Sequence, residues 1–277
     1  MDKELIRQAA AELYKQLPGN ILDEAMDILP EHVGTRMFDE PLVGFGGADD
    51  ALFDEYKKVG VIGPWHMSPA EWLPQAKTVV SLFFPASLEV RQSNRRAKEK
   101  ASDLWAYARI EGQAFIGSYM AALQGWFREL GVEACVPALD PRWLAVRAGE
   151  GIEGYPEIRE DTYGSNWSER HAAYVCGLGT FGLSKGLITE KGMAGRFGSI
   201  LIDAKLAPDL RPYSGIYDYC TRCGACIKRC PVAAIDLEHG KDHTVCGPFL
   251  ALSRTLLAPR YGCGLCQTGV PCETRIP

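Results

Sequence analysis

The stretch Cys220–Pro231 reads CTRCGACIKRCP, and it decides the fold of the C-terminal part of the chain. Its cysteines follow the pattern C-x2-C-x2-C-x3-C-P, a spacing that ligates iron–sulfur clusters of the 4Fe–4S type. The first three thiolates hold three corners of one cubane, whereas the fourth points away and ligates a different cluster. Pro231 then begins a turn that redirects the chain. The stretch therefore predicts a site for two clusters.

A site for two clusters needs four more thiolates, and the remaining C-terminal cysteines supply them. We assign cluster one to Cys220, Cys223, Cys226 and Cys272, and cluster two to Cys230, Cys246, Cys263 and Cys266. The second half contains no further C-x2-C-x2-C run, so the arrangement is a degenerate form of a two-cluster module. A zinc ion on Cys263 and Cys266 is the alternative, because C-x2-C also holds zinc. Zinc would leave Cys230 without cluster partners.

The distribution of cysteine and the net charge restrict the class of protein. Eight of the ten cysteines lie in the last 58 of 277 residues, and we expect Cys135 and Cys176 to be small buried apolar side chains. The net charge of −5 argues against general nucleic-acid binding, which needs a strongly basic surface. The N-terminus has no apolar signal region, and no stretch reaches the roughly 18 apolar residues of a membrane helix. We therefore expect a cytoplasmic protein, not bound to a membrane, whose cysteines ligate metal or do redox chemistry.

Strands and helices alternate in the part of the chain that precedes the cysteines. Buried strands are predicted where apolar and β-branched residues run together, and helices where apolar residues recur every three or four positions. The predicted strands lie at 78–84, 134–138 and 197–203, and the predicted helices at 1–30, 101–130 and 167–176. Residues 31–75 are rich in glycine and proline and are predicted as loop with short elements.

These elements predict an α+β protein with two domains. Residues 1–210 would form an α/β domain for a cofactor or substrate. Residues 211–277 would form a ferredoxin-like domain with two 4Fe–4S clusters. A simple electron carrier would need only about 60 of these residues, so the larger domain must hold whatever the clusters serve.

The stretch Gly177–Gly182 reads GLGTFG and matches the G-x-G-x-x-G dinucleotide fingerprint. That fingerprint binds a pyrophosphate when it follows a strand and opens a helix. Here it follows the predicted helix 167–176 and opens a loop, which is the wrong context. Two alternative roles for the glycines stay open. They could end the helix and form a tight turn, or they could let the backbone approach a flat ligand closely.

The segment from His171 to Asp209 resembles the segment that precedes the clusters in epoxyqueuosine reductases and reductive dehalogenases. The resemblance rests on a helix that ends in Gly177-Leu178-Gly179, on the loop Gly182–Thr189 and on the pair Phe197-Gly198. The ending Tyr261–Gln267 also resembles the second-cluster motif of this family. In the family the last cysteine comes sooner and precedes a proline, whereas here Cys272 follows Pro271.

The resemblance implies a nitroreductase-like N-terminal domain that binds a corrinoid (cobalamin), whose cobalt is reduced by the nearer cluster. It implies that the GLGTFG loop lies against the corrin. The residues expected to contact the cofactor are Gly177, Gly179, Gly182, Lys185, Phe197 and Gly198. Lys185 and Arg196 could hold a phosphate or amide tail of such a cofactor.

A reductive step consumes protons as well as electrons, so we expect a proton donor near the cofactor. Epoxyqueuosine reductases carry an acidic general acid before the helix, and here Tyr163 stands near that position with Asp161 two residues earlier. The candidate catalytic residues are Asp161, Tyr163 and His171. The sequence ends five residues after Cys272, without the helical repeats that read tRNA in epoxyqueuosine reductases. We therefore expect a short form of the family that does not act on tRNA.

The leading hypothesis is an iron–sulfur oxidoreductase that passes electrons from two clusters to a cofactor, expected to be a corrinoid, and to a small substrate. The alternative is a non-catalytic electron carrier or activator that docks a corrinoid protein or another redox partner. A flavin in the N-terminal domain is a third hypothesis. In each case a low-potential donor of the ferredoxin or flavodoxin type is expected. The basic run from Arg91 to Lys100 is either its docking surface or a solvated face.

Overall fold

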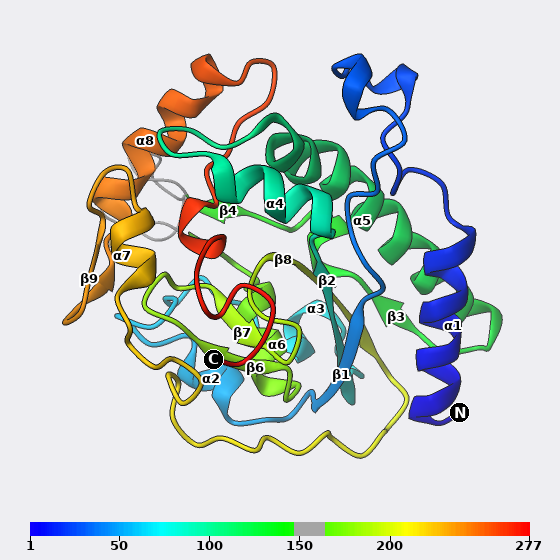
Figure 1. Ribbon diagram of the computed structural model, residues 1–277. Helices are drawn as coiled ribbons and strands as arrows, with labels where there is room; N and C mark the ends of the chain where they lie inside the picture. Colours follow the sequence, from blue (N-terminus) through cyan, green and yellow to red (C-terminus); the bar gives the residue numbers. More distant parts are fainter. Residues whose placement is uncertain (147–163) are drawn as a thin grey trace.

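A four-stranded antiparallel sheet forms the centre of the computed structural model, which describes residues 1–146 and 164–277 (Figure 1). The strand order is β1-β2-β8-β3, with β1 at Leu42–Gly47, β2 at Thr78–Pro85, β8 at Gly195–Ile202 and β3 at Ala134–Cys135. Strand β2 is buried along its whole length because it pairs with β1 and β8 and is covered on both faces. Helices and sheet are mixed along the chain, which confirms the predicted α+β class.

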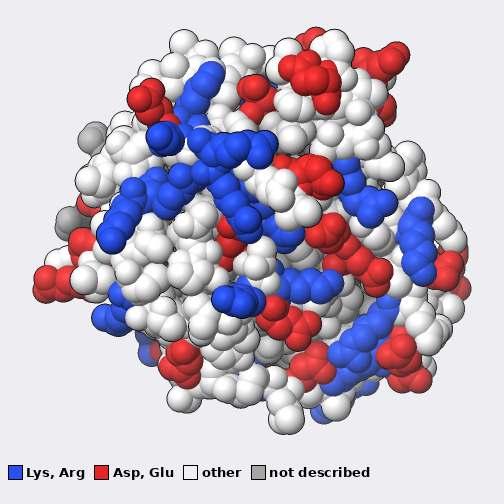
Figure 2. Space-filling model, viewed as in Figure 1, with Lys and Arg blue, Asp and Glu red and all other residues white. Residues whose placement is uncertain are grey.

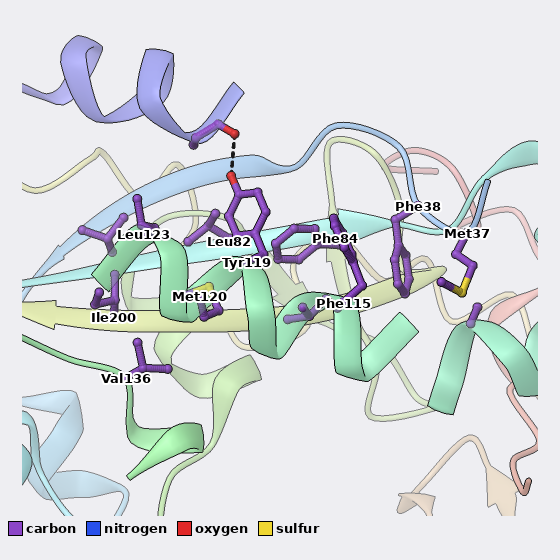
Figure 3. Packing of buried hydrophobic residues seen from close by; sticks show 14 of the residues in the cluster. Met37, Phe38, Leu82, Phe84, Phe115, Tyr119, Met120, Leu123, Val136 and Ile200 are labelled. Carbon is purple, nitrogen blue, oxygen red and sulfur yellow. Dashed lines mark hydrogen bonds between the residues drawn. The ribbon is translucent and has the colours of Figure 1, made fainter. Parts of the chain in front are cut away.

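One face of the sheet is covered by the long helix α5 (Asp103–Glu129) together with α1 (Lys3–Gln16). The rings of Phe84, Phe115 and Tyr119 meet edge to face in this core (Figure 3). The Tyr119 hydroxyl donates a hydrogen bond of 2.6 Å to the Ala10 carbonyl, so its polar end is satisfied inside the core (Figure 3). The predicted helix 101–130 thus agrees closely with α5. Helix α1 is shorter than predicted because Pro18 and Gly19 follow it.

The other face is covered by α6 (Glu169–Val175) and by the short helices α2 (Leu52–Glu55) and α3 (Pro69–Trp72). Cys176 lies fully buried here and Cys135 nearly so, as expected for small apolar side chains. Strand β1 was missed in the sequence because three of its six residues are glycine. A Cβ at Gly44 would lie 2.5 Å from the carbonyl oxygen of Cys176, so glycine lets the end of α6 approach the strand.

The remaining elements are short, apart from the helices α4 and α8. The helices are α4 (Leu88–Arg96), α7 (Ala225–Arg229) and α8 (His243–Leu256), and 3-10 turns occur at Glu24–Met26, Pro30–His32, Pro137–Leu139 and Leu265–Gln267. Three strand pairs join β4 (Ala145–Val146) to β5 (Gly164–Ser165), β6 (Gly179–Phe181) to β7 (Leu187–Thr189) and β9 (Ile235–Asp236) to β10 (Gly240–Lys241). Within the described ranges, no helix combines the length and the apolar composition needed to cross a membrane.

The cysteine-bearing segment is joined to the sheet and to α4 by buried polar contacts. The Arg229 guanidinium on α7 donates to the carbonyls of Asn94 and Ala97, each at 2.9 Å. The buried Asn94 side chain donates to the Thr268 hydroxyl at 3.0 Å. Near the C-terminus, the Met193 N–H donates to the Cys272 carbonyl at 2.9 Å. These bonds hold both ends of the segment against the N-terminal part.

Candidate functional site

The eight C-terminal cysteines gather into two groups, and none of the chain's ten cysteines forms a disulfide. Burial, followed by the neighbouring thiols of Cys220, Cys226 and Cys223, raises the pKa of Cys272 to about 12. These four residues are the set assigned to cluster one.

The second group consists of the other four cysteines, whose pKa values also reflect burial and neighbouring thiols. Burial and the thiols of Cys266 and Cys230 raise the pKa of Cys246. Burial and the thiols of Cys266 and Cys246 raise the pKa of Cys263 to about 11. The neighbours therefore match the set assigned to cluster two. The two groups meet where Cys266 lies near Cys226. Burial and the neighbouring Cys266 thiol raise the pKa of Cys226 to about 11.

A cavity opens among the cluster-one thiols. Its walls include Cys220, Cys223, Cys226 and Cys272, together with Gly182, Leu183 and Ile188 from the hairpin of β6 and β7. Leu183 also packs with Ile235 and Cys266, so it lies between the two cysteine groups. Such a cavity fits a cubane, which takes one thiolate at each of its four irons. Because these thiols are protonated when free, assembly of a cluster would release protons.

A single metal ion needs its ligands closer together than a cubane does. In the part of the chain that the structure describes, no three Cys, His, Asp or Glu side chains lie close enough together to hold one ion. A cubane separates its thiolates more widely than a single ion does, because each thiolate binds a different iron.

A second pocket lies beside the second group of cysteines, and its cavity volume is about 80 Å³. Gly264 and Gln267 line it, and they belong to the segment that carries Cys263 and Cys266. The opposite wall carries three arginines from three elements: Arg109 of α5, Arg170 of α6 and Arg196 of β8. We call this space the arginine pocket.

Arg196 of the arginine pocket lies where β8 extends beyond its neighbour β3. Strand β3 pairs only with Leu201 and Ile202, so the described residues provide no strand partner for residues 195–200 along that edge. Arg196 lies on this part of β8, and its Nε and Nη2 donate to Gln113 Oε1 at 2.9 and 2.6 Å. Burial and the positive charges of Arg109 and Arg170 lower the pKa of Arg196 to about 9. The pocket therefore has an unusually positive interior.

The glycines of the GLGTFG stretch are accounted for by local packing. Gly177 ends α6 with φ of +77°, and the stretch then enters the hairpin of β6 and β7. A Cβ at Gly179 would collide with the Ile188 carbonyl oxygen across the hairpin. The stretch therefore follows a helix, as predicted, but contains strand β6 where a loop was predicted. It opens no helix, so its context is wrong for a dinucleotide. Of these glycines, Gly182 lines the cluster-one cavity.

The other residues expected to contact a cofactor lie in different places. Lys185 stands in the hairpin turn with φ of +57°, where burial and nearby Lys241 lower its pKa. Phe197 packs on Phe83 with ring centroids 4.6 Å apart. Gly198 faces Met120 of α5. Contact between these residues and a corrinoid stays a prediction.

The structure describes only one of the three candidate proton donors, His171. Asp161 and Tyr163 lie outside the described residues. His171 lies on α6, where its Nδ1 is 2.7 Å from the Ser168 hydroxyl and its ring packs between Tyr56 and Phe181. Burial lowers its pKa to about 3, so the imidazole is neutral near pH 7. A catalytic role for His171 stays a prediction.

Four residues of interest were missed in the sequence. They are Arg109, Gln113, Arg170 and Glu169. Arg109 and Gln113 stand four apart on α5 and therefore share a helix face, which is the one signal that could have indicated them.

Glu169 begins α6, and its carboxyl group is buried beside the side chains of Ser199 and Trp167. Burial raises its pKa to about 7, above the value of about 4.3 in an unfolded chain. The neutral form is therefore favoured in the folded state. Its contribution to stability is fully present below about pH 4.3 and is lost as the pH rises through about 7.

The Glu169→Gln variant should remove this pH dependence. We expect Glu169→Gln to be more stable than the wild type at pH 8, by on the order of 2 kcal/mol in unfolding free energy. The two proteins should converge only near pH 4. Anaerobic thermal unfolding across this pH range measures the difference. The exposed Glu129→Gln serves as the control. Parallel curves for Glu169→Gln and the wild type would contradict the assignment.

Comparison with known proteins supports the same architecture. The 4Fe-4S binding domain family matches residues 214–236. A tetrachloroethene reductive dehalogenase of Desulfitobacterium hafniense is 38% identical over 77 residues, which cover 27% of this chain and 14% of the dehalogenase. Among solved structures, an epoxyqueuosine reductase from Streptococcus thermophilus aligns over 99% of this chain and 66% of its own, with 16% identity and a TM-score of 0.54.

A catabolic reductive dehalogenase in complex with 3-bromo-4-hydroxybenzoic acid aligns over 99% of this chain and 36% of its own, with 16% identity and a TM-score of 0.52. In each comparison this chain spans less than two thirds of the relative's length. The resemblance expected from the sequence is confirmed at the level of the fold: this chain has the fold shared by epoxyqueuosine reductases and reductive dehalogenases, and it carries a 4Fe-4S binding domain.

Proposed function

We propose that this chain is an iron–sulfur reductase that passes single electrons from two 4Fe–4S clusters to an acceptor in the arginine pocket. One observation carries the proposal: the segment with Cys263 and Cys266 also supplies Gly264 and Gln267 to the wall of that pocket. An acceptor bound there would lie beside cluster two. In this proposal residues 1–210 hold the acceptor and residues 211–277 hold the clusters.

The exposure of the cysteines suggests the direction of electron flow. Cys223 of cluster one is exposed, whereas Cys266 of cluster two is buried. Cluster one would therefore receive electrons at the surface, and cluster two would deliver them inside. Leu183 and Ile235 pack between the two groups and keep water from the gap.

A basic surface beside cluster one fits an acidic electron donor. Figure 2 shows Lys and Arg side chains gathered on the face that carries α4 and α7. Arg96, Lys98, Arg222 and Lys228 are exposed, and the hydrogen bonds of Arg229 hold α7 against the end of α4. Arg95 of the same basic run instead binds Glu273. We propose a low-potential ferredoxin or flavodoxin as the donor, attracted by this charge.

The resemblance implies a nitroreductase-like domain with a corrinoid as acceptor, whose cobalt, when bound, would change its oxidation state one electron at a time. Gly177 and Gly179 face protein atoms, and the arginine pocket has a cavity of only about 80 Å³. Asp161, Tyr163 and His171 remain the proposed proton donors.

A small molecule is the proposed substrate, and tRNA is not expected because the net charge of −5 does not favour nucleic-acid binding. A corrinoid protein is the alternative partner. We place the protein in the cytoplasm, where eight ligand thiols would stay reduced.

Anaerobic purification followed by assays of iron, sulfide and zinc tests the proposal. We expect about eight irons per chain. Chemically reduced protein should then be re-oxidised by added cobalamin or flavin, with a change in the visible spectrum of the one that binds. Full iron without a response to either would favour the electron carrier. Much less iron, with zinc present, would refute the cluster assignment.

A further inference from the structure

We propose that the arginine pocket binds a small molecule through an anionic group, a carboxylate or a phosphate, held by Arg109, Arg170 and Arg196. The inference deepens the proposed function and names the ligand class of the same site. Binding of the anion requires no electron transfer, so the two can be tested separately.

Two of the three arginines of the pocket lack a charged partner in the described part of the chain. Arg109 and Arg196 form no ion pair with any residue in the ranges 1–146 and 164–277. Arg109 lies over the Tyr261 ring with its guanidinium carbon 4.4 Å from the centroid, and its buried Nε has no hydrogen-bond partner. Like charges held together in a half-buried space cost free energy unless a counter-charge is present. A bound anion would supply it.

The orientation of Arg196 is set before any ligand arrives. Two of its nitrogens, Nε and Nη2, bind the same oxygen of Gln113, which fixes the plane of the guanidinium. Its Nη1 makes no hydrogen bond with the described residues. A planar guanidinium donates well to carboxylate and phosphate oxygens. Two further arginines at the same pocket make a bidentate or bridging arrangement available.

Apart from the arginines and Gln267, the side chains that line the pocket are apolar, which indicates the body of the ligand. Phe38, Ala86 and Ala108 line it, and Trp105 adds a large aromatic surface. Gly264 has φ of +66°, and a Cβ there would collide with the Trp105 ring, so this ring is packed directly against the second-cluster segment. A ligand with an aromatic or apolar body and an anionic end fits this division.

Isothermal titration of the oxidised protein with both clusters present tests the inference. The probes are benzoate, phenyl phosphate and the neutral benzyl alcohol. We expect one of the two anions to bind and benzyl alcohol not to bind, and the stronger anion identifies the group. Arg109→Gln and Arg196→Gln should each weaken binding about tenfold or more. Arg128→Gln, an exposed site on the same helix, should leave it unchanged.

Iron content and visible spectra equal to wild type establish that a variant is folded. If Arg196→Gln loses its clusters, the comparison of anionic with neutral probes on the wild type still decides. Equal affinity for benzoate and benzyl alcohol, no binding of either anion, or unchanged affinity in both folded variants would overturn the inference. Anion binding without any electron acceptance would uphold it while refuting the proposed reductase.

Discussion

Replacement of Cys226 by serine should remove about half of the iron, about four of eight atoms per chain. Cys226 lines the cluster-one cavity with Cys220, Cys223 and Cys272. Serine is a much poorer ligand for iron than a thiolate, so a cubane with three remaining thiolates would be lost or become labile. Cluster two keeps all four of its proposed ligands. Iron and sulfide analysis, with electron paramagnetic resonance of the reduced protein, would measure the loss.

Substitution of other cysteines tests which ligands belong to which cluster. Cys272→Ser should reproduce the residual spectrum of Cys226→Ser, whereas Cys230→Ser should reproduce that of Cys246→Ser. Cys135→Ser is the matched control, because this buried cysteine lies outside both groups and should keep all the iron. The opposite pairing of Cys272 and Cys230 would show that the fourth thiol of the run does not cross to cluster two.

The cluster ligands could be predicted from sequence because their signal is local. The cubane itself sets the spacing of Cys220, Cys223 and Cys226, so the pattern is visible within a few residues. The long buried elements were predictable for a similar reason, since β2 and α5 carry uninterrupted apolar patterns. These parts need no knowledge of how the chain returns on itself.

The arginine pocket could not be predicted in that way. Arg109, Arg170 and Arg196 come from α5, α6 and β8, and only tertiary packing brings them together. Helix α4 was missed because it buries a polar side chain, Asn94, that bonds to Thr268 and Ser102 rather than to solvent. Because its sequence is rich in charged residues, the helix showed no apolar pattern that would indicate a buried face.

Replacement of Glu273 by glutamine should destabilise the protein by about 2 kcal/mol or more, because it breaks a largely buried ion pair. The Glu273 carboxylate is 3% exposed, and its two oxygens share the single Nε–H of Arg95, each 2.8 Å from that nitrogen. It also accepts one of 2.7 Å from the Gly269 N–H, and Arg91 lies 3.9 Å away. The expected loss is smaller than for a fully buried pair because Arg95 is 42% exposed.

The same substitution should weaken cluster one, because Glu273 follows Cys272 directly. The backbone carbonyls of both residues accept hydrogen bonds from Ala194 and Met193 beside β8, so the carboxylate helps to hold Cys272 in place. We expect Glu273→Gln to lower the thermal midpoint and to lose iron faster in air. The exposed Glu238→Gln is the control in the same segment. In a double-mutant cycle, Arg95→Gln should cost less on the Glu273→Gln background than alone. Additive effects with unchanged iron loss would mean that the C-terminal turn holds Cys272 without this ion pair.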